Sequence, residues 1–221
     1  MPEKKAIETV EMFSFVQRLV HWTHTLAFLV LVVTGAILYI PPLQSLSMGT
    51  AGWAARASHR YGAIFLAVVI LIYVIFDAKR LFRSMKLIFT WGADDLEWLK
   101  AMPAVYFRGE VKKLPPQDRF NTGQKAFYLC VVLSLLALGV SGVLMWVGKG
   151  YVSPVLFRWG VLVHDVAAIA ITVFFLVHLY LAMMHPLMRD GMQAIRFGYI
   201  SLDEVKILHA KWYKHLVRGE D

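Results

Sequence analysis

The chain has 221 residues, of which 58% are hydrophobic and 17% are charged. Soluble domains are about 25% charged, so this composition and the mean hydropathy of +0.58 favour an integral membrane protein. The single cysteine, Cys130, excludes an iron–sulfur cluster held by this chain, a disulfide framework and a CxxCH attachment site. The net charge of +8 raises the question of nucleic-acid binding, which its distribution along the chain answers below.

Four apolar segments are long enough to cross a bilayer. The expected spans are residues 19–40, 59–76, 126–147 and 160–184. The first ends at Pro41-Pro42 with no small-residue cleavage site after it, so we expect a span and not a removable signal peptide. Residues 1–17 form a polar and then amphipathic lead-in, and a short loop with Gly49 and Gly52 leads to the second span.

The longest polar stretch, residues 77–125, joins the second span to the third. Asp94 with Glu97 three residues later resembles a capping box, and the apolar residues after it predict an amphipathic helix lying on the membrane surface. The tail from His185 is basic and amphipathic. We therefore expect one membrane-embedded domain over 1–221, an all-α bundle of four transmembrane helices with a surface helix in its long loop.

Four spans place both termini on one side of the membrane, and the positive-inside rule identifies that side. Of the 23 lysines and arginines, 19 lie before the first span, in the middle loop or in the tail. The other two loops hold the remaining four, Arg56, Arg60, Lys149 and Arg158. Both termini are therefore expected in the cytoplasm, and this partition explains the positive charge without nucleic acid.

Histidines in the spans fall into two pairs by depth. His164 and His178 are fourteen residues apart, which puts them on nearly one helix face and roughly 21 Å apart along the axis. The topology places His59 level with His164 toward the outside, and His21 level with His178 toward the cytoplasm. Facing imidazoles at one depth are what a b-type haem iron needs, so two haems are expected. The alternative is four hydrogen-bonded core histidines.

Two further histidines compete as ligands. His24 lies one turn beyond His21, and His185 lies seven residues beyond His178. We prefer His178 because its spacing from His164 is closer to a whole number of turns, and we expect an interfacial or proton-handling role for His185. The last two histidines belong to the basic tail and are expected to be solvated; they are His209 and His215.

Residues that a porphyrin would need lie near these histidines. Arg18 and Arg60 are candidates for ion pairs with haem propionates, although arginines that snorkel to the membrane interface explain them equally well. Small residues in or beside the spans would let a helix approach a flat ring, and ordinary helix packing explains them as well; these are Gly35, Gly62, Gly139 and Gly142.

At these residues the sequence resembles the cytochrome b (gamma) subunit of membrane-bound formate dehydrogenase, a family related to the cytochrome b subunits of nickel–iron hydrogenases. The resemblance covers nearly the whole chain. The matching stretches are Arg18-Leu-Val-His21-Trp22, Arg56-Ala-Ser-His59, Asn121-Thr-Gly123-Gln124-Lys125, His164 with His178, and Lys211-Trp212-Tyr213. The Asn-x-Gly-Gln-Lys stretch is the most specific and favours the formate dehydrogenase branch. Arg60 is a departure, since some relatives have an apolar residue or proline after the histidine.

The resemblance implies an outer haem b on His59 and His164 and an inner haem b on His21 and His178. It further implies a pocket for menaquinone or ubiquinone beside the inner haem, at Asn121, Gly123 and Gln124. A quinone carbonyl needs a hydrogen-bond donor, which both amides supply. Asn121-Thr122 is also typical of a helix N-cap, and the two roles are compatible.

The chain would then be a di-haem b subunit of a formate dehydrogenase-type respiratory complex in a bacterial or archaeal inner membrane. It would carry electrons from a periplasmic-side iron–sulfur subunit, fed by a molybdenum or tungsten catalytic subunit, to quinone near the cytoplasmic side. This chain alone has no site that would oxidise formate. Membrane lipid is a further expected partner, and a higher oligomer of the complex is compatible with the resemblance.

Two alternatives stay open at this point. The chain could be the cytochrome b subunit of a nickel–iron hydrogenase or of another periplasmic oxidoreductase, which only the neighbouring subunits would reveal. It could also be a haem-free transporter or membrane scaffold whose histidines conduct protons.

Overall fold

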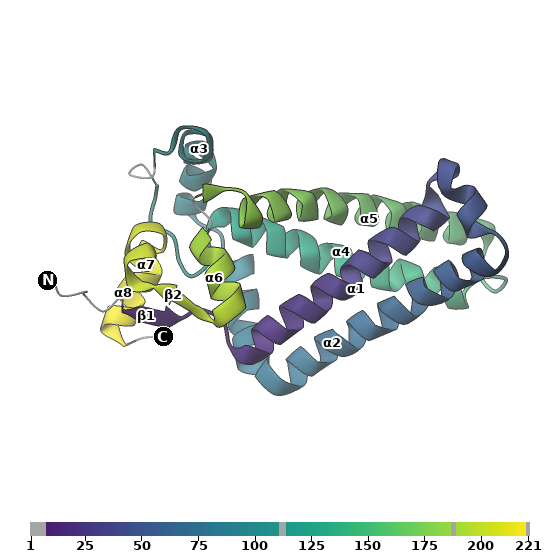
Figure 1. Cartoon of the computed structure of the whole chain (residues 1–221), viewed down its shortest axis with the longest axis horizontal. Coiled ribbons are helices and arrows are strands. Elements are labelled where there is room, and N and C mark those ends of the chain that lie inside the picture. Colours follow the sequence, from purple (N-terminus) through teal and green to yellow (C-terminus); the bar gives the residue numbers. More distant parts are fainter. Residues whose placement is uncertain (1–7, 111–113, 187–188, 220–221) are drawn as a thin grey trace, which may run out of the picture. The chain divides into compact units, whose positions relative to one another are not determined.

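The computed structural model describes residues 8–110, 114–186 and 189–219 (Figure 1). The elements, in chain order, are β1 Thr9–Glu11, α1 Phe15–Tyr39, the 3-10 helix η1 Pro41–Ser47, α2 Gly49–Phe89, α3 Ala93–Arg108, α4 Thr122–Val147, α5 Pro154–Met183, α6 Arg189–Phe197, β2 Tyr199–Ser201, α7 Leu202–Leu208 and α8 Ala210–Arg218. By length and apolar composition, α1, α2, α4 and α5 can each cross a membrane. The expected fold class, an all-α integral membrane protein with four spans, is confirmed.

The prediction of a single domain with both termini in the cytoplasm stays a prediction. Lys4 and Lys5, which the charge partition counts, lie outside the described residues.

The second membrane helix is longer than its apolar span. Helix α2 begins at Gly49, so Gly52 lies inside the helix and not in a loop as expected. A Cβ atom at Gly52 would lie 1.8 Å from the Ser47 carbonyl oxygen, so only glycine fits there. The backbone leaves helical geometry at Asp77 (φ −146°, ψ 42°), directly after the predicted end of the span, and the helix then resumes. Apolarity marks the segment in lipid, whereas the helical backbone can continue past it.

The chain groups into two compact units. The four-helix unit consists of residues 15–81 and 134–172, and the terminal unit consists of the described parts of 1–14, 82–133 and 173–221. Helices α2, α4 and α5 contribute residues to both.

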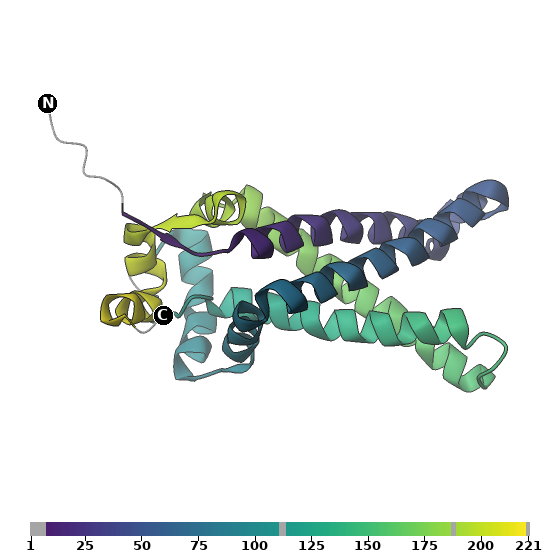
Figure 2. The same cartoon turned by 90° about the horizontal axis from the view of Figure 1, so that it is seen from below.

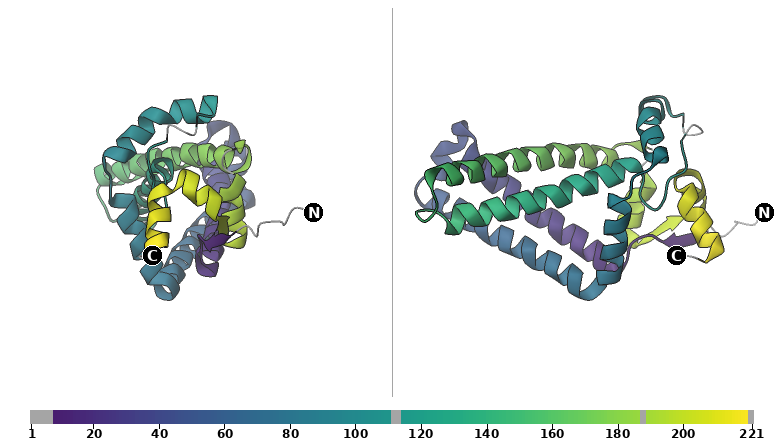
Figure 3. Two further views of the ribbon diagram at one scale, coloured as in Figure 1. Left: turned by 90° about the vertical axis from the view of Figure 1, so that its left-hand side faces the viewer. Right: turned by 180° about the vertical axis from the view of Figure 1, so that it is seen from behind.

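In the four-helix unit, glycines bring the helices of each hairpin together. Helices α1 and α2 form a hairpin that η1 closes (Figure 2). A Cβ atom at Gly62 of α2 would be 3.5 Å from the Leu31 side chain of α1. Gly160 of α5 leaves still less room, because its Cβ would be 2.8 Å from the Leu144 side chain of α4. Helices α4 and α5 run side by side in the ribbon seen from behind (Figure 3). The lipid-facing sides of these helices are lined with exposed apolar residues, as expected for a membrane span.

The terminal unit has a small hydrophobic core that the sequence analysis did not predict. Strands β1 and β2 pair antiparallel, with Val10 opposite Ile200, beside helices α6, α7 and α8 (Figure 1). The buried residues of this core are Met12, Ala194, Ile200, Val205 and Trp212. Arg119, from the segment before α4, contacts two residues of this core. Its guanidinium donates to the Met12 carbonyl oxygen and lies 5.1 Å from the Trp212 ring centroid. The lead-in and the tail thus fold together.

His209 was expected to be solvated, and this was wrong. It is 4% exposed, and its Nδ1 lies 2.7 Å from the Asp118 carbonyl oxygen, to which it donates. Burial lowers the pKa of His209, and the bond to Asp118 opposes that effect without cancelling it. His215 on α8 is exposed, as expected.

The surface helix of the long loop forms at the expected place with a different cap. Helix α3 starts at Ala93, and Asp95, not Glu97, accepts a hydrogen bond from the capping backbone N–H of Gly92 at 2.9 Å. Asp94 lies in the first turn and instead forms an ion pair with Lys211. The expectation that Asp94 and Glu97 form the capping box was therefore wrong, because the helix begins one residue before Asp94.

Candidate functional site

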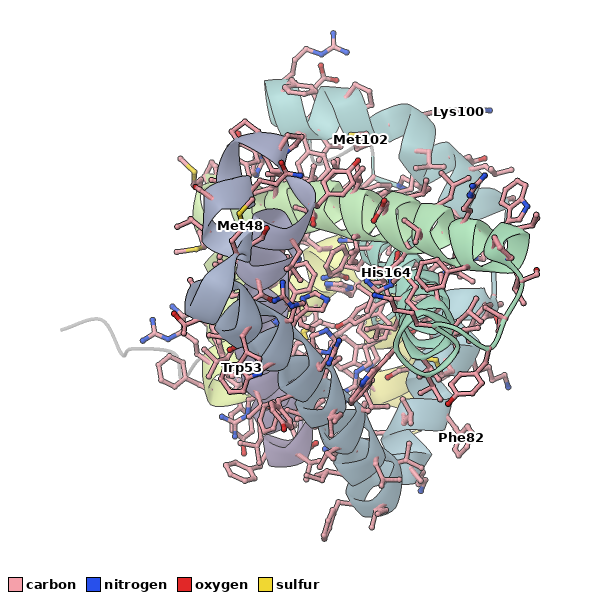
Figure 4. All side chains as sticks on the ribbon, turned by 90° about the vertical axis from the view of Figure 1, so that its right-hand side faces the viewer. Met48, Trp53, Phe82, Lys100, Met102 and His164 are labelled. Carbon is pink, nitrogen blue, oxygen red and sulfur yellow. The ribbon has the colours of Figure 1, made fainter. Side chains whose placement is uncertain are left out.

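His59 on α2 and His164 on α5 face each other within the four-helix unit. Their ring centroids are 6.3 Å apart with the ring planes tilted by 59°. Figure 4 shows His164 directed toward the middle of the helices, whereas Met48 and Trp53 lie at the exposed surface. The two rings therefore lie close together in the structure, and their pairing as haem ligands stays a prediction.

A hydroxyl group from the neighbouring helix holds each ring. Thr34 Oγ1 of α1 lies 2.9 Å from His59 Nδ1, and Ser141 Oγ of α4 lies 3.0 Å from His164 Nδ1. Both hydroxyl residues are buried, at 8% and 3% exposure. Neither Thr34 nor Ser141 belongs to a sequence pattern that would have identified it.

A glycine beside each hydroxyl makes room for the ring. A Cβ atom at Gly35 would lie 3.5 Å from His59 Cε1, and one at Gly142 would lie 3.4 Å from His164 Cε1. Both distances are close to van der Waals contact, so the two glycines lie directly against the rings. Two of the four glycines noted in the sequence therefore border the histidine pair, and Gly139 has nothing within 4 Å of its Cβ position.

These residues fit a b-type haem. An imidazole nitrogen binds a first-row metal ion at about 2 Å, so two rings on one ion have centroids roughly 6 Å apart. The observed 6.3 Å agrees with that value. With Nδ1 of each ring engaged, Nε2 is the nitrogen left for the iron, as in other metal sites where the second ring nitrogen has a protein partner.

The histidines of the predicted inner pair lie in different units. His21 belongs to the four-helix unit and has its ring edge-on to Trp22, with centroids 5.1 Å apart. His178 belongs to the terminal unit, where its ring stacks on Phe127 with centroids 4.5 Å apart and planes within 4°. Their pairing stays a prediction.

His185, the competitor of His178, is buried at the end of α5. Its Nε2 lies 3.2 Å from the Tyr106 carbonyl oxygen, and its ring is edge-on to the Tyr106 ring at 5.0 Å. A carbonyl oxygen only accepts, so Nε2 carries the proton and donates it to that bond. This contact favours a structural role for His185.

The start of α4 forms a capping box. The Asn121 side-chain oxygen accepts from the backbone N–H of Gln124 at 2.9 Å, and the Gln124 side-chain oxygen accepts from the backbone N–H of Asn121 at 2.9 Å. The N-cap alternative raised for Asn121 is therefore present in the structure. With both oxygens engaged, the side-chain NH₂ groups of the two amides are the donors left for a ligand.

Trp98 explains the glycine between those amides. A Cβ atom at Gly123 would lie 2.9 Å from the end of the Trp98 ring, which is buried on α3. The close approach of an indole to the α4 backbone thus requires glycine at this position.

A buried ion pair that the sequence analysis missed joins the same helix start to α3. Lys125 Nζ donates to both carboxylate oxygens of Asp95, at 2.9 and 3.1 Å, and to the Thr90 carbonyl oxygen at 3.1 Å. The Thr122 hydroxyl lies 2.8 Å from Asp95 Oδ1. Burial alone would raise the pKa of Asp95, but hydrogen bonds from Lys125, Thr122 and the Gly92 backbone hold that pKa below its usual value.

The two candidate propionate partners contact aromatic rings. The Arg60 guanidinium lies 5.4 Å from the Trp146 ring centroid, and the Arg18 guanidinium lies 5.8 Å from the Phe15 ring centroid. Their roles toward haem stay predictions.

Comparison with known proteins supports the same class of protein. The formate dehydrogenase cytochrome b556(fdo) subunit of Escherichia coli K12 is 26% identical, over 96% of this chain and 95% of its own length. The nitrate-inducible formate dehydrogenase cytochrome b556(Fdn) subunit of the same strain is 24% identical, over 93% and 91%. The formate dehydrogenase cytochrome b556 subunit of Haemophilus influenzae is 25% identical, over 90% and 80%.

The resemblance to these subunits, inferred from short motifs, thus holds over almost the full chain. The prokaryotic cytochrome b561 family matches residues 12–198, which include all four membrane helices and every candidate ligand. The chain belongs to the prokaryotic cytochrome b561 family.

Proposed function

We propose that this chain is the di-haem b membrane subunit of a formate dehydrogenase-type respiratory complex. His59 and His164 would hold the outer haem, and His21 and His178 the inner one. Electrons would come from a periplasmic-side iron–sulfur subunit, served by a molybdenum or tungsten catalytic subunit, and reach quinone near the cytoplasmic side. Both termini would be cytoplasmic.

The observation that carries this proposal is the His59–His164 pair. Two rings from different helices, 6.3 Å apart with both Nδ1 atoms held, leave two nitrogens for one iron. Membership of a cytochrome b family supports haem b as the cofactor. A bound haem supplies reversible one-electron chemistry, and the chain supplies the ligands, the dielectric and the hydrogen bonds that tune it.

His164 and His178 on one continuous helix support the two-haem proposal. Helix α5 contains both, and fourteen residues of helix separate them by roughly 21 Å along the axis. One helix would then provide a ligand to each haem, at opposite depths of the membrane.

For quinone we propose the amide donors at the start of α4. The capping box holds both side chains by their oxygens, so the NH₂ groups of Asn121 and Gln124 would donate to a quinone carbonyl. Gly123 would lie at this pocket between the two amides, with its own backbone against the Trp98 ring.

A visible spectrum and five alanine variants test the haem assignment. The purified protein should show a b-type α-band on dithionite reduction, with two haems per chain. His59→Ala and His164→Ala should each remove the same haem, and His21→Ala and His178→Ala the other, while His185→Ala should keep both. Two haems retained in His178→Ala would overturn the choice over His185. Absence of the band would favour a haem-free scaffold, and co-purification with a hydrogenase would favour the alternative complex.

Two substitutions of one residue separate the cap from the quinone donor. Asn121→Asp keeps the accepting oxygen of the cap and removes the NH₂ donor, whereas Asn121→Ala removes both. Both variants should keep two haems and slow the re-oxidation of reduced haem by added quinone, but only Asn121→Ala should also lose about 1 kcal/mol of stability. Normal re-oxidation in Asn121→Asp would refute the quinone assignment.

A further inference from the structure

The two hydroxyl groups at the histidine pair have a fixed direction of hydrogen bonding. Each also lies against the carbonyl oxygen four residues earlier in its own helix, with Thr34 Oγ1 2.7 Å from the Val30 oxygen and Ser141 Oγ 2.5 Å from the Ala137 oxygen. A carbonyl oxygen only accepts, so the single hydroxyl proton of each residue is given to the backbone. The hydroxyl oxygen is then an acceptor toward the histidine.

This direction determines the tautomer of both rings. His59 and His164 must carry their proton on Nδ1 and donate it to Thr34 and Ser141, which leaves the lone pair on Nε2. Each ring also has a backbone carbonyl as an acceptor, that of Leu31 at His59 and that of Leu138 at His164. A neutral imidazole has a single N–H, so with the proton on Nδ1 the other nitrogen, Nε2, is the one left for a metal ion.

The construction occurs twice. On α1 the hydroxyl residue is followed by a glycine, Thr34-Gly35, and the pair faces a histidine of the next membrane helix. On α4 the same order recurs in Ser141-Gly142, again facing a histidine of the next membrane helix. Back-bonding alone does not create this contact. Thr172 on α5 donates to the Ala168 oxygen at 2.7 Å, and the described residues show no histidine ring bonded to it.

We propose that Thr34 and Ser141 are positioning residues that hold the Nδ1–H tautomer of the ligands and lower the reduction potential of the haem bound there. This inference rests on the proposed function, because it needs haem iron between His59 and His164. An acceptor on Nδ1–H makes the other ring nitrogen a stronger electron donor. A stronger donor stabilises ferric iron more than ferrous iron, because ferric iron carries the additional positive charge.

A redox titration of the α-band of the purified protein in detergent, with its haems bound, tests this. Thr34→Val replaces the hydroxyl by a methyl group of similar shape. The equilibrium constant for reducing one of the two haems should rise by about three- to tenfold, which is about 28 to 59 mV for one electron. Ser141→Ala should shift the same haem in the same direction, and the double variant should show roughly the product of the two changes.

The controls keep the inference falsifiable. Thr34→Ser retains the hydroxyl and should titrate as wild type, and so should Thr172→Val, which makes the same chemical change elsewhere in a membrane helix. If Thr34→Val loses that haem while Thr34→Ser retains it, the hydroxyl is needed to hold the ring, and the shift in Ser141→Ala then decides the effect on the potential. Equal behaviour of Thr34→Val and Thr34→Ser, or a wild-type titration of Thr34→Val, would overturn it.

Failure of the proposed function gives a different result. A wild-type protein without a b-type band, or a His59→Ala variant that keeps both haems, contradicts the haem site itself. An unshifted Thr34→Val in a protein that passes both checks contradicts only the role of the hydroxyls.

Discussion

The His59–His164 pair and the Asp95–Lys125 cluster are both polar sites in a largely apolar chain, and they differ in how completely the protein satisfies them. The Asp95 carboxylate accepts hydrogen bonds from Lys125, Thr122 and the Gly92 backbone. Lys125 has a further bond to the Thr90 carbonyl oxygen. That cluster is closed on itself, as a buried ion pair must be to repay its desolvation.

The histidine pair is half satisfied by comparison. Each ring has its Nδ1 bonded to a hydroxyl, which leaves Nε2 with its lone pair for another partner. Two such nitrogens on facing rings 6.3 Å apart indicate a ligand site. The polar groups of the Asp95–Lys125 cluster bond to one another, whereas the His59–His164 pair keeps one nitrogen of each ring for a ligand.

Breaking the charged cluster should give the largest loss of stability. Lys125→Met leaves the Asp95 carboxylate buried without its cation, which costs about 3–5 kcal/mol. The Asp95→Asn/Lys125→Met double variant should recover most of that loss, because no uncompensated charge remains. Denaturant unfolding in detergent, followed by helical circular dichroism, measures the change.

A surface ion pair is the matched control. Lys206 and Asp203 are 3.2 Å apart with side chains 44% and 83% exposed. Lys206→Met should cost less than about 1 kcal/mol. Equal losses in Lys125→Met and Lys206→Met would show that the Asp95 cluster is not the closed, buried unit described here.

The next largest loss of stability should come from adding a methyl group at Gly123, close to the Asp95–Lys125 cluster. Gly123→Ala forces the Trp98 ring to move, because the new Cβ would lie 2.9 Å from it, and overpacking of this kind costs about 1–3 kcal/mol. Gly139→Ala, on the same helix with nothing within 4 Å of its Cβ position, should be neutral or stabilising. The same unfolding measurement compares the two, and a neutral Gly123→Ala would contradict the close packing of Trp98.

The smallest expected change in stability comes from a third buried group, His209. Its pKa is lowered in the folded protein, so the unfolded chain takes up a proton first as the pH falls below about 6.5. The stabilisation is therefore complete above that pH and declines below it, by at most about 1.4 kcal/mol per pH unit. His209→Gln should flatten the stability curve between about pH 6.5 and 5, and the exposed His215→Gln should leave it unchanged.

Asp95 should respond in a separate pH range. Its folded pKa is lowered, so its contribution is present above about pH 4 and is lost only as the pH falls further. A decline near neutral pH that survives in His209→Gln would show that another group is responsible.

Some features could be predicted from the sequence because they are properties of single segments. Long apolar runs identify the four membrane helices, and regular helix geometry places His164 and His178 on one face of α5. The Asn-x-Gly-Gln-Lys stretch was recognisable as a helix start because an N-cap residue depends only on its near neighbours in the chain. The same kind of local pattern gave the wrong capping box for α3. Several acidic residues lie near the start of that helix, and the sequence does not show which of them caps it.

Other features depend on which segments meet. His209 looked like a solvated tail residue until the tail folded over the segment around Asp118. The partner of Lys125 is thirty residues earlier in the chain, and no local pattern connects the two.

The sequence by itself therefore determined the class of protein, the spans and the histidines that can be ligands. Only the tertiary structure decided that Thr34 and Ser141 hold those histidines, because a hydroxyl in a membrane helix looks the same in sequence whichever neighbour it faces. Periodicity reports the environment along one helix, whereas a hydrogen bond between helices depends on their packing against each other.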